Sequence, residues 1–309
     1  MSTPISPTHS LVCLALLLIS VSCGDEKPVS RTKGDKGPLI VYTVNEPLRY
    51  FVDRIGGKGV RAVFPMKEAG DPAFWEPSTE VLLDYQKADL IVRNGAEYAR
   101  WMARASLPAS RIVDSSRAFA DHIIEIKNSV THQHGPAGKH SHSGHAFTTW
   151  LDPKLAVQQA LAVKEALSAR LPEDAKGIEE RFVALRRDLE DLDQQIAGIV
   201  AKKPDLPLLG SHPVYQYLGK RYSLSLVSVH WEPEEIPAEA DWTQLEKILA
   251  DHEATAMLWE AEPRAEVRSR LEKLGVRCLV YDPCASTPKQ GDFLTRMREN
   301  VANLGKAWQ

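Results

Sequence analysis

The chain has 309 residues, more than the roughly 100–200 of a typical domain, so its length predicts two lobes. Hydrophobic residues make up 43% and charged residues 26%, as in an ordinary folded globular protein. The net charge is -3 and no long basic run occurs, so nucleic-acid binding has no electrostatic support.

The N-terminus has the pattern of an export signal. Leu11 to Val21 is an apolar run too short for a transmembrane helix, which needs about 20 residues. Ser22-Cys23-Gly24 follows at once and is typical of a lipoprotein processing site, so Cys23 is expected to carry lipid. An ordinary cleaved signal with an incidental Cys23 is the alternative. We therefore expect a signal segment over 1–23 and a polar, flexible tether over 24–37.

Residues 38–172 are expected to form an α/β lobe. Short β-branched runs predict strands, and capped or periodic segments between them predict helices. The expected strands are 39–44, 60–64, 89–92 and 111–114, and the expected helices are 48–55, 77–86, 98–105 and 155–171. Strands that alternate with helices indicate a parallel sheet covered on both faces. The segment 129–145 is rich in His, Gly and Ser, has no apolar period, and is expected to be a mobile surface loop.

A long helix and a second α/β lobe should follow. Apolar residues at spacings of three and four from Phe182 to Val200 form one stripe, which predicts a linker helix over 173–202. The second lobe, 203–309, repeats the alternating order. Its expected strands are 206–209, 224–229, 256–259 and 277–281, and its expected helices are 242–251, 264–274 and 293–308.

Candidate ligands lie in the loops that follow strands, because ligands bind at the carboxyl ends of open parallel sheets. Imidazoles and carboxylates there could hold a divalent metal ion. The alternatives are a helix-capping histidine, a turn aspartate before proline and solvated carboxylates. The candidates are His212, Asp282, His230, Glu232 and Glu260.

Five histidines lie on one short tract. Clustered imidazoles favour zinc or copper and do not suit magnesium or calcium, which prefer oxygen ligands. The tract could bind such ions loosely and raise their local supply, or it could be a solvated linker without a role. Its members are His132, His134, His140, His142 and His145.

Two cysteines belong to the folded body, Cys278 and Cys284, and a disulfide between them remains open. The chain has no HExxH zinc-protease motif, no Gly-x-Ser-x-Gly elbow and no P-loop. These absences favour a binding protein over an enzyme.

Several segments together resemble the zinc/manganese substrate-binding lipoproteins of bacterial ABC importers, over about residues 38 to 309. The matching segments are GDPAFWEP (70–77), the histidine tract, TTWLDP (148–153), SHPVYQY (211–217), LWE (258–260) and YDP (281–283). The resemblance implies two lobes joined by a rigid helix. It also implies that the protein receives a metal ion outside the cytoplasm and delivers it to an importer permease.

The resemblance also implies four metal ligands, of which only two are present. The third falls on His212 and the fourth on Asp282, but Ala73 and Thr148 stand where the family has histidines. We therefore expect one of three situations. Substitute ligands come from His142, His145, His230, Glu232 or Glu260; or the cleft binds a metal complex; or the protein is a surface interaction or adhesion lipoprotein without a cleft metal. A zinc-dependent hydrolase is a further alternative, with Glu260 or Glu232 as its general base. Zinc is the expected ion, with manganese possible.

Overall fold

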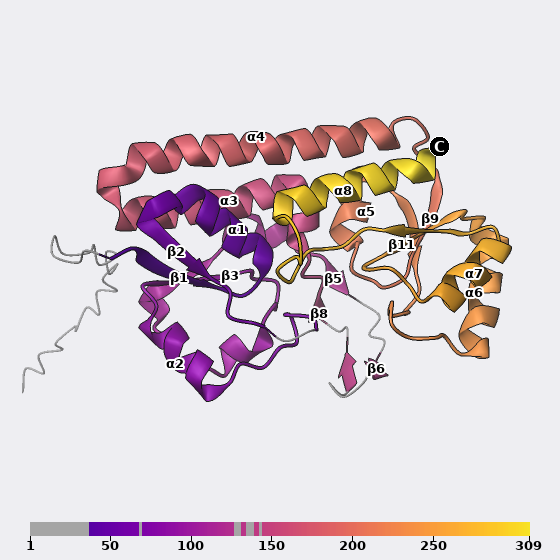
Figure 1. The fold of residues 1–309 in the computed structure, drawn as a ribbon, viewed down its shortest axis with the longest axis horizontal. Coiled ribbons are helices and arrows are strands. Elements are labelled where there is room, and N and C mark those ends of the chain that lie inside the picture. The colour runs from indigo at the N-terminus through magenta and orange to yellow at the C-terminus, as the bar shows by residue number, and fades with distance from the viewer. Residues whose placement is uncertain (1–36, 68–69, 127–130, 134–138, 142–143) are drawn as a thin grey trace, which may run out of the picture.

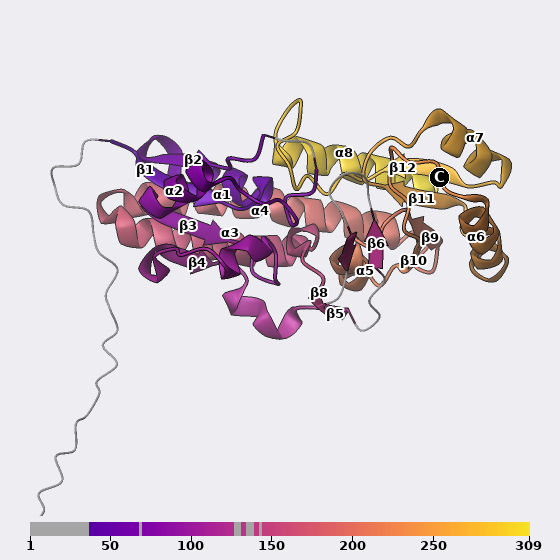
Figure 2. The same cartoon turned by 90° about the horizontal axis from the view of Figure 1, so that it is seen from below.

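The computed structural model describes residues 37–67, 70–126, 131–133, 139–141 and 144–309. Two four-stranded parallel sheets lie at opposite ends of the molecule, and the long helix α4 (Ala175–Val200) runs past both (Figure 1). The view from below separates the sheets along the long axis (Figure 2). This is the expected two-lobed α/β architecture.

The first lobe is built on the sheet β2-β1-β3-β4. Its strands are β1 (Leu39–Thr43), β2 (Val60–Val63), β3 (Leu90–Arg93) and β4 (Ile112–Asp114). Its helices are α1 (Glu46–Gly56), α2 (Thr79–Lys87) and α3 (Pro153–Arg170). Helix α1 begins where it does because the Asn45 side chain accepts a hydrogen bond from the Leu48 N–H and Pro47 occupies the first turn.

The second lobe repeats this plan with the sheet β10-β9-β11-β12. Its strands are β9 (Pro207–Gly210), β10 (Ser225–Ser228), β11 (Ala256–Trp259) and β12 (Arg277–Val280). Its helices are α5 (Gln216–Tyr222), α6 (Glu239–His252), α7 (Ala265–Lys273) and α8 (Phe293–Gly305). Every pairing in the two large sheets is parallel, so the carboxyl ends of neighbouring strands meet at one edge.

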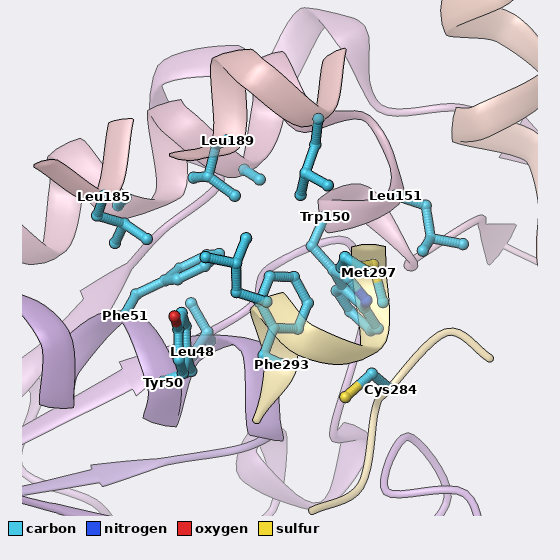
Figure 3. Close-up of a cluster of buried hydrophobic side chains, with 14 of the residues drawn as sticks. Leu48, Tyr50, Phe51, Trp150, Leu151, Leu185, Leu189, Cys284, Phe293 and Met297 are labelled. Carbon is cyan, nitrogen blue, oxygen red and sulfur yellow. The ribbon is translucent and has the colours of Figure 1, made fainter. Parts of the chain in front are cut away.

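One apolar layer joins the lobes. The predicted stripe of α4 is buried along the whole helix and packs against α1, α3 and α8. Phe293, at the start of α8, lies against Tyr50 and Phe51 of α1, with ring centroids 5.5 Å apart in both pairs (Figure 3). The Trp150 ring lies in the same cluster, and its Nε1–H donates to the Pro283 carbonyl at 2.8 Å. The lobes therefore share a core instead of a flexible hinge.

Two local expectations were wrong. Residues 98–105 do not form an α-helix, because Glu97 and Ala99 have positive φ and only a 3-10 turn, Arg100–Ala103, follows. The histidine-rich segment is not devoid of structure, since β6 (Thr131–Gln133) pairs with β7 (Lys139–Ser141). Likewise β5 (Glu125–Ile126) pairs with β8 (Gly144–His145).

In the described part of the chain, no helix is both long and apolar enough to cross a membrane. The predicted signal, its lipidation site Cys23 and most of the tether lie outside the described residues. The expected lobe boundaries stay predictions.

Candidate metal centre

Three neighbouring strands of the second sheet end at the candidate site. His212 follows β9, Glu232 follows β10, and Glu260 comes directly after β11. The loops are tied together by their backbones. The Ser211 N–H donates to the Leu258 carbonyl at 2.8 Å, and the Trp231 N–H donates to the Ser211 carbonyl at 2.6 Å. Strand order alone therefore brings these three side chains to one edge.

The three side chains form a compact group of metal-type donors. One ligand atom from each of His212, Glu232 and Glu260 lies within 4.8 Å of the other two. His212 is almost fully buried, and its Nδ1 lies 3.2 Å from Glu232 Oε1. The His230 ring meets the His212 ring edge-on, with centroids 5.7 Å apart. Within the described ranges, this is the one cluster of three or more such residues.

Electrostatics in this group favour a cation. Burial, together with the nearby charges of Glu234, Glu235 and Asp71, raises the pKa of Glu232 to about 7. Burial also raises the pKa of Glu260 well above its ordinary value, and Glu232 adds the largest charge effect. Crowded carboxyls with few compensating positive charges hold protons or bind a positive ion.

Asp71 brings the first lobe to the site. Its charge raises the pKa of Glu232 and of Glu260, so it lies within electrostatic reach of both. Asp71 is exposed as a residue, yet desolvation by the surrounding protein raises the pKa of its carboxyl to about 6. Asp71 was not among the ligands predicted from the sequence. The available signal was its place in the Gly70–Pro77 loop, just before the position where the family's histidine is replaced.

Both positions with missing histidines have structural roles. Ala73 is buried in the core of the first lobe. Thr148 is also buried, and its Oγ1 donates to the Val214 carbonyl at 2.5 Å, across the junction of the lobes. Ala73 has no ligand atom in its side chain, and the Thr148 hydroxyl is already engaged with the Val214 carbonyl.

Asp282 follows β12 as expected but stands outside the three-residue group. Its Oδ1 accepts from the Cys284 N–H at 2.7 Å, and its Oδ2 lies 3.5 Å from Arg296 Nε. Its charge still raises the pKa of Glu260. The assignment of Asp282 and His230 as ligands stays a prediction.

The histidine tract is only partly described. His145 is outside the three-residue group, and its Nδ1 lies 3.3 Å from Glu97 Oε2. The backbones of His132 and His140 pair in the register of β6 and β7, whereas His134 and His142 lie outside the described residues. A metal role for this tract stays a prediction.

Cys278 and Cys284 are both free thiols, so the open question of a disulfide is answered for this structure. Burial raises the pKa of each thiol, that of Cys278 to about 11. Raised pKa values leave both as thiols near neutral pH, and thiols are poor metal ligands.

The family model described as ZnuA, zinc-uptake complex component A, periplasmic, matches residues 41–307, and the chain belongs to this family. It is 23% identical over 312 residues to the zinc-binding protein AdcA of Streptococcus pyogenes, covering 95% of this chain and 60% of AdcA. The chain thus spans well under two thirds of AdcA. It is 24% identical to the high-affinity zinc uptake system protein ZnuA of Bacillus subtilis, covering 95% of each.

Solved structures confirm the fold. The metal-dependent lipoprotein YcdH from Bacillus subtilis superposes with a TM-score of 0.74 at 20% identity, covering 87% of this chain and 99% of YcdH. Zn(II)-bound AdcA from Streptococcus pneumoniae gives a TM-score of 0.73 at 18% identity, covering 88% of this chain and 58% of AdcA. The expected two-lobed class is therefore confirmed.

Proposed function

We propose that this protein captures zinc outside the cytoplasm and delivers it to the permease of an ABC importer. One observation carries the proposal: His212, Glu232 and Glu260 converge at the ends of three adjacent strands. A buried imidazole beside two carboxyls is a zinc-type donor set. The family's description as a zinc-uptake component, and the names of AdcA and ZnuA, support zinc as the cargo.

The protein itself would supply most of the ligands of a tetrahedral zinc site. His212 would give a nitrogen ligand, Glu232 and Glu260 would give oxygen ligands, and Asp71 or a water would complete a tetrahedron. Burial and the repulsion between neighbouring carboxyls raise the pKa values of Glu232 and Glu260, and the ion would relieve the repulsion. Manganese, which accepts more oxygen ligands, is the competing cargo. Capture and release break no covalent bond, so we propose a receptor and not an enzyme.

Zinc titration of the metal-free protein against a chromogenic chelator tests the site. We expect one tight equivalent, weakened at least about tenfold by His212→Ala or Glu260→Gln, because each change removes a direct ligand. His122→Ala is the matched control, since His122 is exposed and remote in sequence from the three strands. Tight binding that survives both site changes would place the zinc elsewhere and end this proposal.

The membrane attachment is a separate proposal. Lipid on Cys23 and the polar segment 24–37 would hold the receptor beside its permease at high effective concentration. Cell fractionation of the full chain and of Cys23→Ser tests it. We expect the wild-type chain in the membrane fraction and the variant in the soluble exported fraction. An unchanged distribution would rule out a lipid anchor at Cys23.

A further inference from the structure

A buried hydroxyl in the first lobe lacks a hydrogen-bond partner. Tyr98 is only 4% exposed, and within the described residues its Oη atom has no partner. Its ring packs edge-on against Phe147 and Trp150, with centroids 5.3 Å and 5.8 Å away. A buried hydroxyl without a partner destabilises the folded state, because it loses its bonds to water and gains none in return. The position of this hydroxyl therefore calls for an explanation.

A tight turn after β3 holds the Tyr98 backbone in place. The Tyr98 N–H donates to the Gly95 carbonyl at 3.0 Å, and Ala96, Glu97 and Ala99 all have positive φ. Positive φ costs energy for residues other than glycine, so the surrounding contacts must stabilise this turn. Because the turn constrains the backbone and two rings constrain the side chain, the hydroxyl has little freedom to find another partner.

The aromatic neighbours lead from Tyr98 to the Asp71 loop. The Phe147 ring that packs on Tyr98 also packs on the Phe74 ring, with centroids 5.9 Å apart. Phe74 closes a turn with Asp71, because its N–H donates to the Asp71 carbonyl at 3.1 Å. Burial and, after it, the charge of Asp71 raise the pKa of Tyr98. The Asp71 carboxyl therefore lies within electrostatic reach of the Tyr98 hydroxyl.

Asp71 links this hydroxyl to the metal-type donors of the other lobe. Its charge also raises the pKa values of Glu232 and Glu260. Its Oδ1 accepts from the Ala73 N–H at 2.8 Å, which uses one of about four acceptor positions on a carboxylate. The remaining positions can serve both a metal ion and a hydroxyl donor.

The Tyr98 hydroxyl is better suited to donate a hydrogen bond than to bind zinc directly. Burial raises the pKa of Tyr98 well above its ordinary value, so the side chain stays a neutral phenol near neutral pH. Zinc sites in proteins use imidazole, thiolate and carboxylate ligands, and a neutral phenol is a poor substitute. A phenol O–H is a good donor to a carboxylate, and such donors hold ligating carboxylates in place.

We propose that Tyr98 is a positioning residue of the metal centre, whose hydroxyl donates to the Asp71 carboxylate when zinc is bound. This role rests on the proposed function, because it requires an ion at the His212 group. Zinc would keep Asp71 charged, and the Tyr98 hydroxyl would then gain a charged acceptor. The first lobe would in this way supply an oxygen ligand in place of the histidine that Ala73 replaces.

Zinc titration of the full chain tests the proposal with Tyr98→Phe, which removes only the hydroxyl. We expect the affinity to fall at least about tenfold in the otherwise unchanged chain, but less than about twofold when Asp71→Asn is already present. The amide of Asp71→Asn can still accept from the Ala73 N–H, but it is a poorer zinc ligand. Tyr222→Phe is the matched control, because the buried Tyr222 hydroxyl donates to Asp193 at 2.8 Å. It should leave zinc affinity unchanged.

Two further measurements separate a positioning role from a structural one. Urea unfolding of metal-free Tyr98→Phe should give a midpoint equal to or above that of the wild type, because the lost hydroxyl had no partner. Tyr222→Phe should lower the midpoint, since it loses a hydrogen bond. Zinc should also change the ultraviolet absorbance of tyrosine in the wild type. This change should shrink in Tyr98→Phe and persist in Tyr222→Phe.

The outcomes at Tyr98 and at His212 are distinguishable. Weaker zinc binding in Tyr98→Phe that disappears in the Asp71→Asn background, with metal-free stability retained, supports the positioning role. Unchanged affinity, an equal loss in both backgrounds, or a clearly less stable metal-free Tyr98→Phe protein overturns it. If His212→Ala still abolishes tight binding in that case, the proposed function stands without Tyr98. A tight zinc equivalent that ignores His212→Ala ends the proposed function and the role of Tyr98 together.

Discussion

Glu232 and Glu260 destabilise the metal-free protein when their carboxyls are charged. Each carboxyl sits where burial and neighbouring acids disfavour its charge. With a pKa of about 7, Glu232 is largely protonated in mild acid and charged in mild base. Residues that destabilise the empty protein are expected where a ligand later compensates for them.

The raised pKa of Glu232 should make the unfolding free energy depend on pH. Its pKa is raised in the folded state, from 4.5 to about 7, so the folded chain binds this proton more tightly than the unfolded chain. Stability from this group is complete below about pH 4.5 and is lost as pH rises through 7, by at most about 3 kcal/mol. Urea unfolding of the metal-free protein at pH 5 and pH 8 measures the loss. Glu232→Gln should reduce the loss of stability between pH 5 and pH 8, and the exposed control Glu80→Gln should leave that loss unchanged. Equal losses in the wild type and both variants would contradict the raised pKa of Glu232.

A substitution at Thr148 tests whether this residue has a structural role or is a metal ligand. Thr148→Val keeps the shape but leaves the Val214 carbonyl without its buried donor, so we expect a loss of about 1–3 kcal/mol in unfolding free energy. Zinc affinity should remain within about threefold, since the hydroxyl is not a ligand in this proposal. Urea unfolding and zinc titration check the two quantities. Unchanged stability with lost zinc binding would instead make Thr148 a ligand. Thr243→Val is the control, because Thr243 is exposed on α6.

At the scale of elements, the spacing of apolar residues and the helix-capping residues predicted most of the fold. The stripe from Phe182 to Val200 predicted α4 because only a helix brings those spacings to one face. Helix α5 was missed, since seven residues with Gly219 inside are too short to show a period. The turn at Glu97 and Ala99 was also missed, because tertiary contacts hold a backbone conformation that their residue types disfavour.

The candidate site was only partly predictable for a related reason. His212 and Glu260 could be found because they directly follow predicted strands. The choice of Glu232 over His145 depends on which strands are neighbours, and one sequence does not give the order β10-β9-β11. Family spacing also directed attention to Ala73 and Thr148, whose side chains have become part of the packing.

Helix α4 offers a test of its own stability. Gly198 lies in its last turn, and a Cβ there would meet no atom within 4 Å. Gly198→Ala should therefore stabilise the protein by about 0.5–1 kcal/mol, by removing the backbone freedom of glycine. Gly177→Ala in the same helix is the matched comparison, because its Cβ would come within 2.4 Å of Asp174 Oδ1. Thermal unfolding should rank Gly198→Ala above wild type and Gly177→Ala below Gly198→Ala; the reverse order would contradict the packing described for α4.

At the scale of the whole molecule, several buried hydrogen bonds join the lobes beside the site. Trp150 donates to Pro283 at 2.8 Å, and the Tyr217 hydroxyl donates to the Ala146 carbonyl at 2.9 Å. The buried stripe of α4 spans both lobes, and α8 packs on it and on α1. Opening the lobes would break these bonds and expose the apolar cluster of Figure 3. All three donors of the group also come from one lobe, so an ion can bind without the lobes closing.

Zinc loading should therefore leave the overall shape nearly unchanged. We expect the backbone to move by less than about 1 Å, with change confined to the loops after β9, β10 and β11 and to the Asp71 loop. Small-angle scattering of the metal-free and zinc-loaded protein should give the same radius of gyration. Amide exchange should slow in those loops and remain unchanged in α4.

Trp150→Phe removes the donor to Pro283 but keeps an aromatic ring. It should loosen the junction of the lobes and make the radius of gyration respond more to zinc. A clear compaction of the wild-type protein on loading would mean that the lobes close on the ion, and that the first lobe contributes more ligands than Asp71.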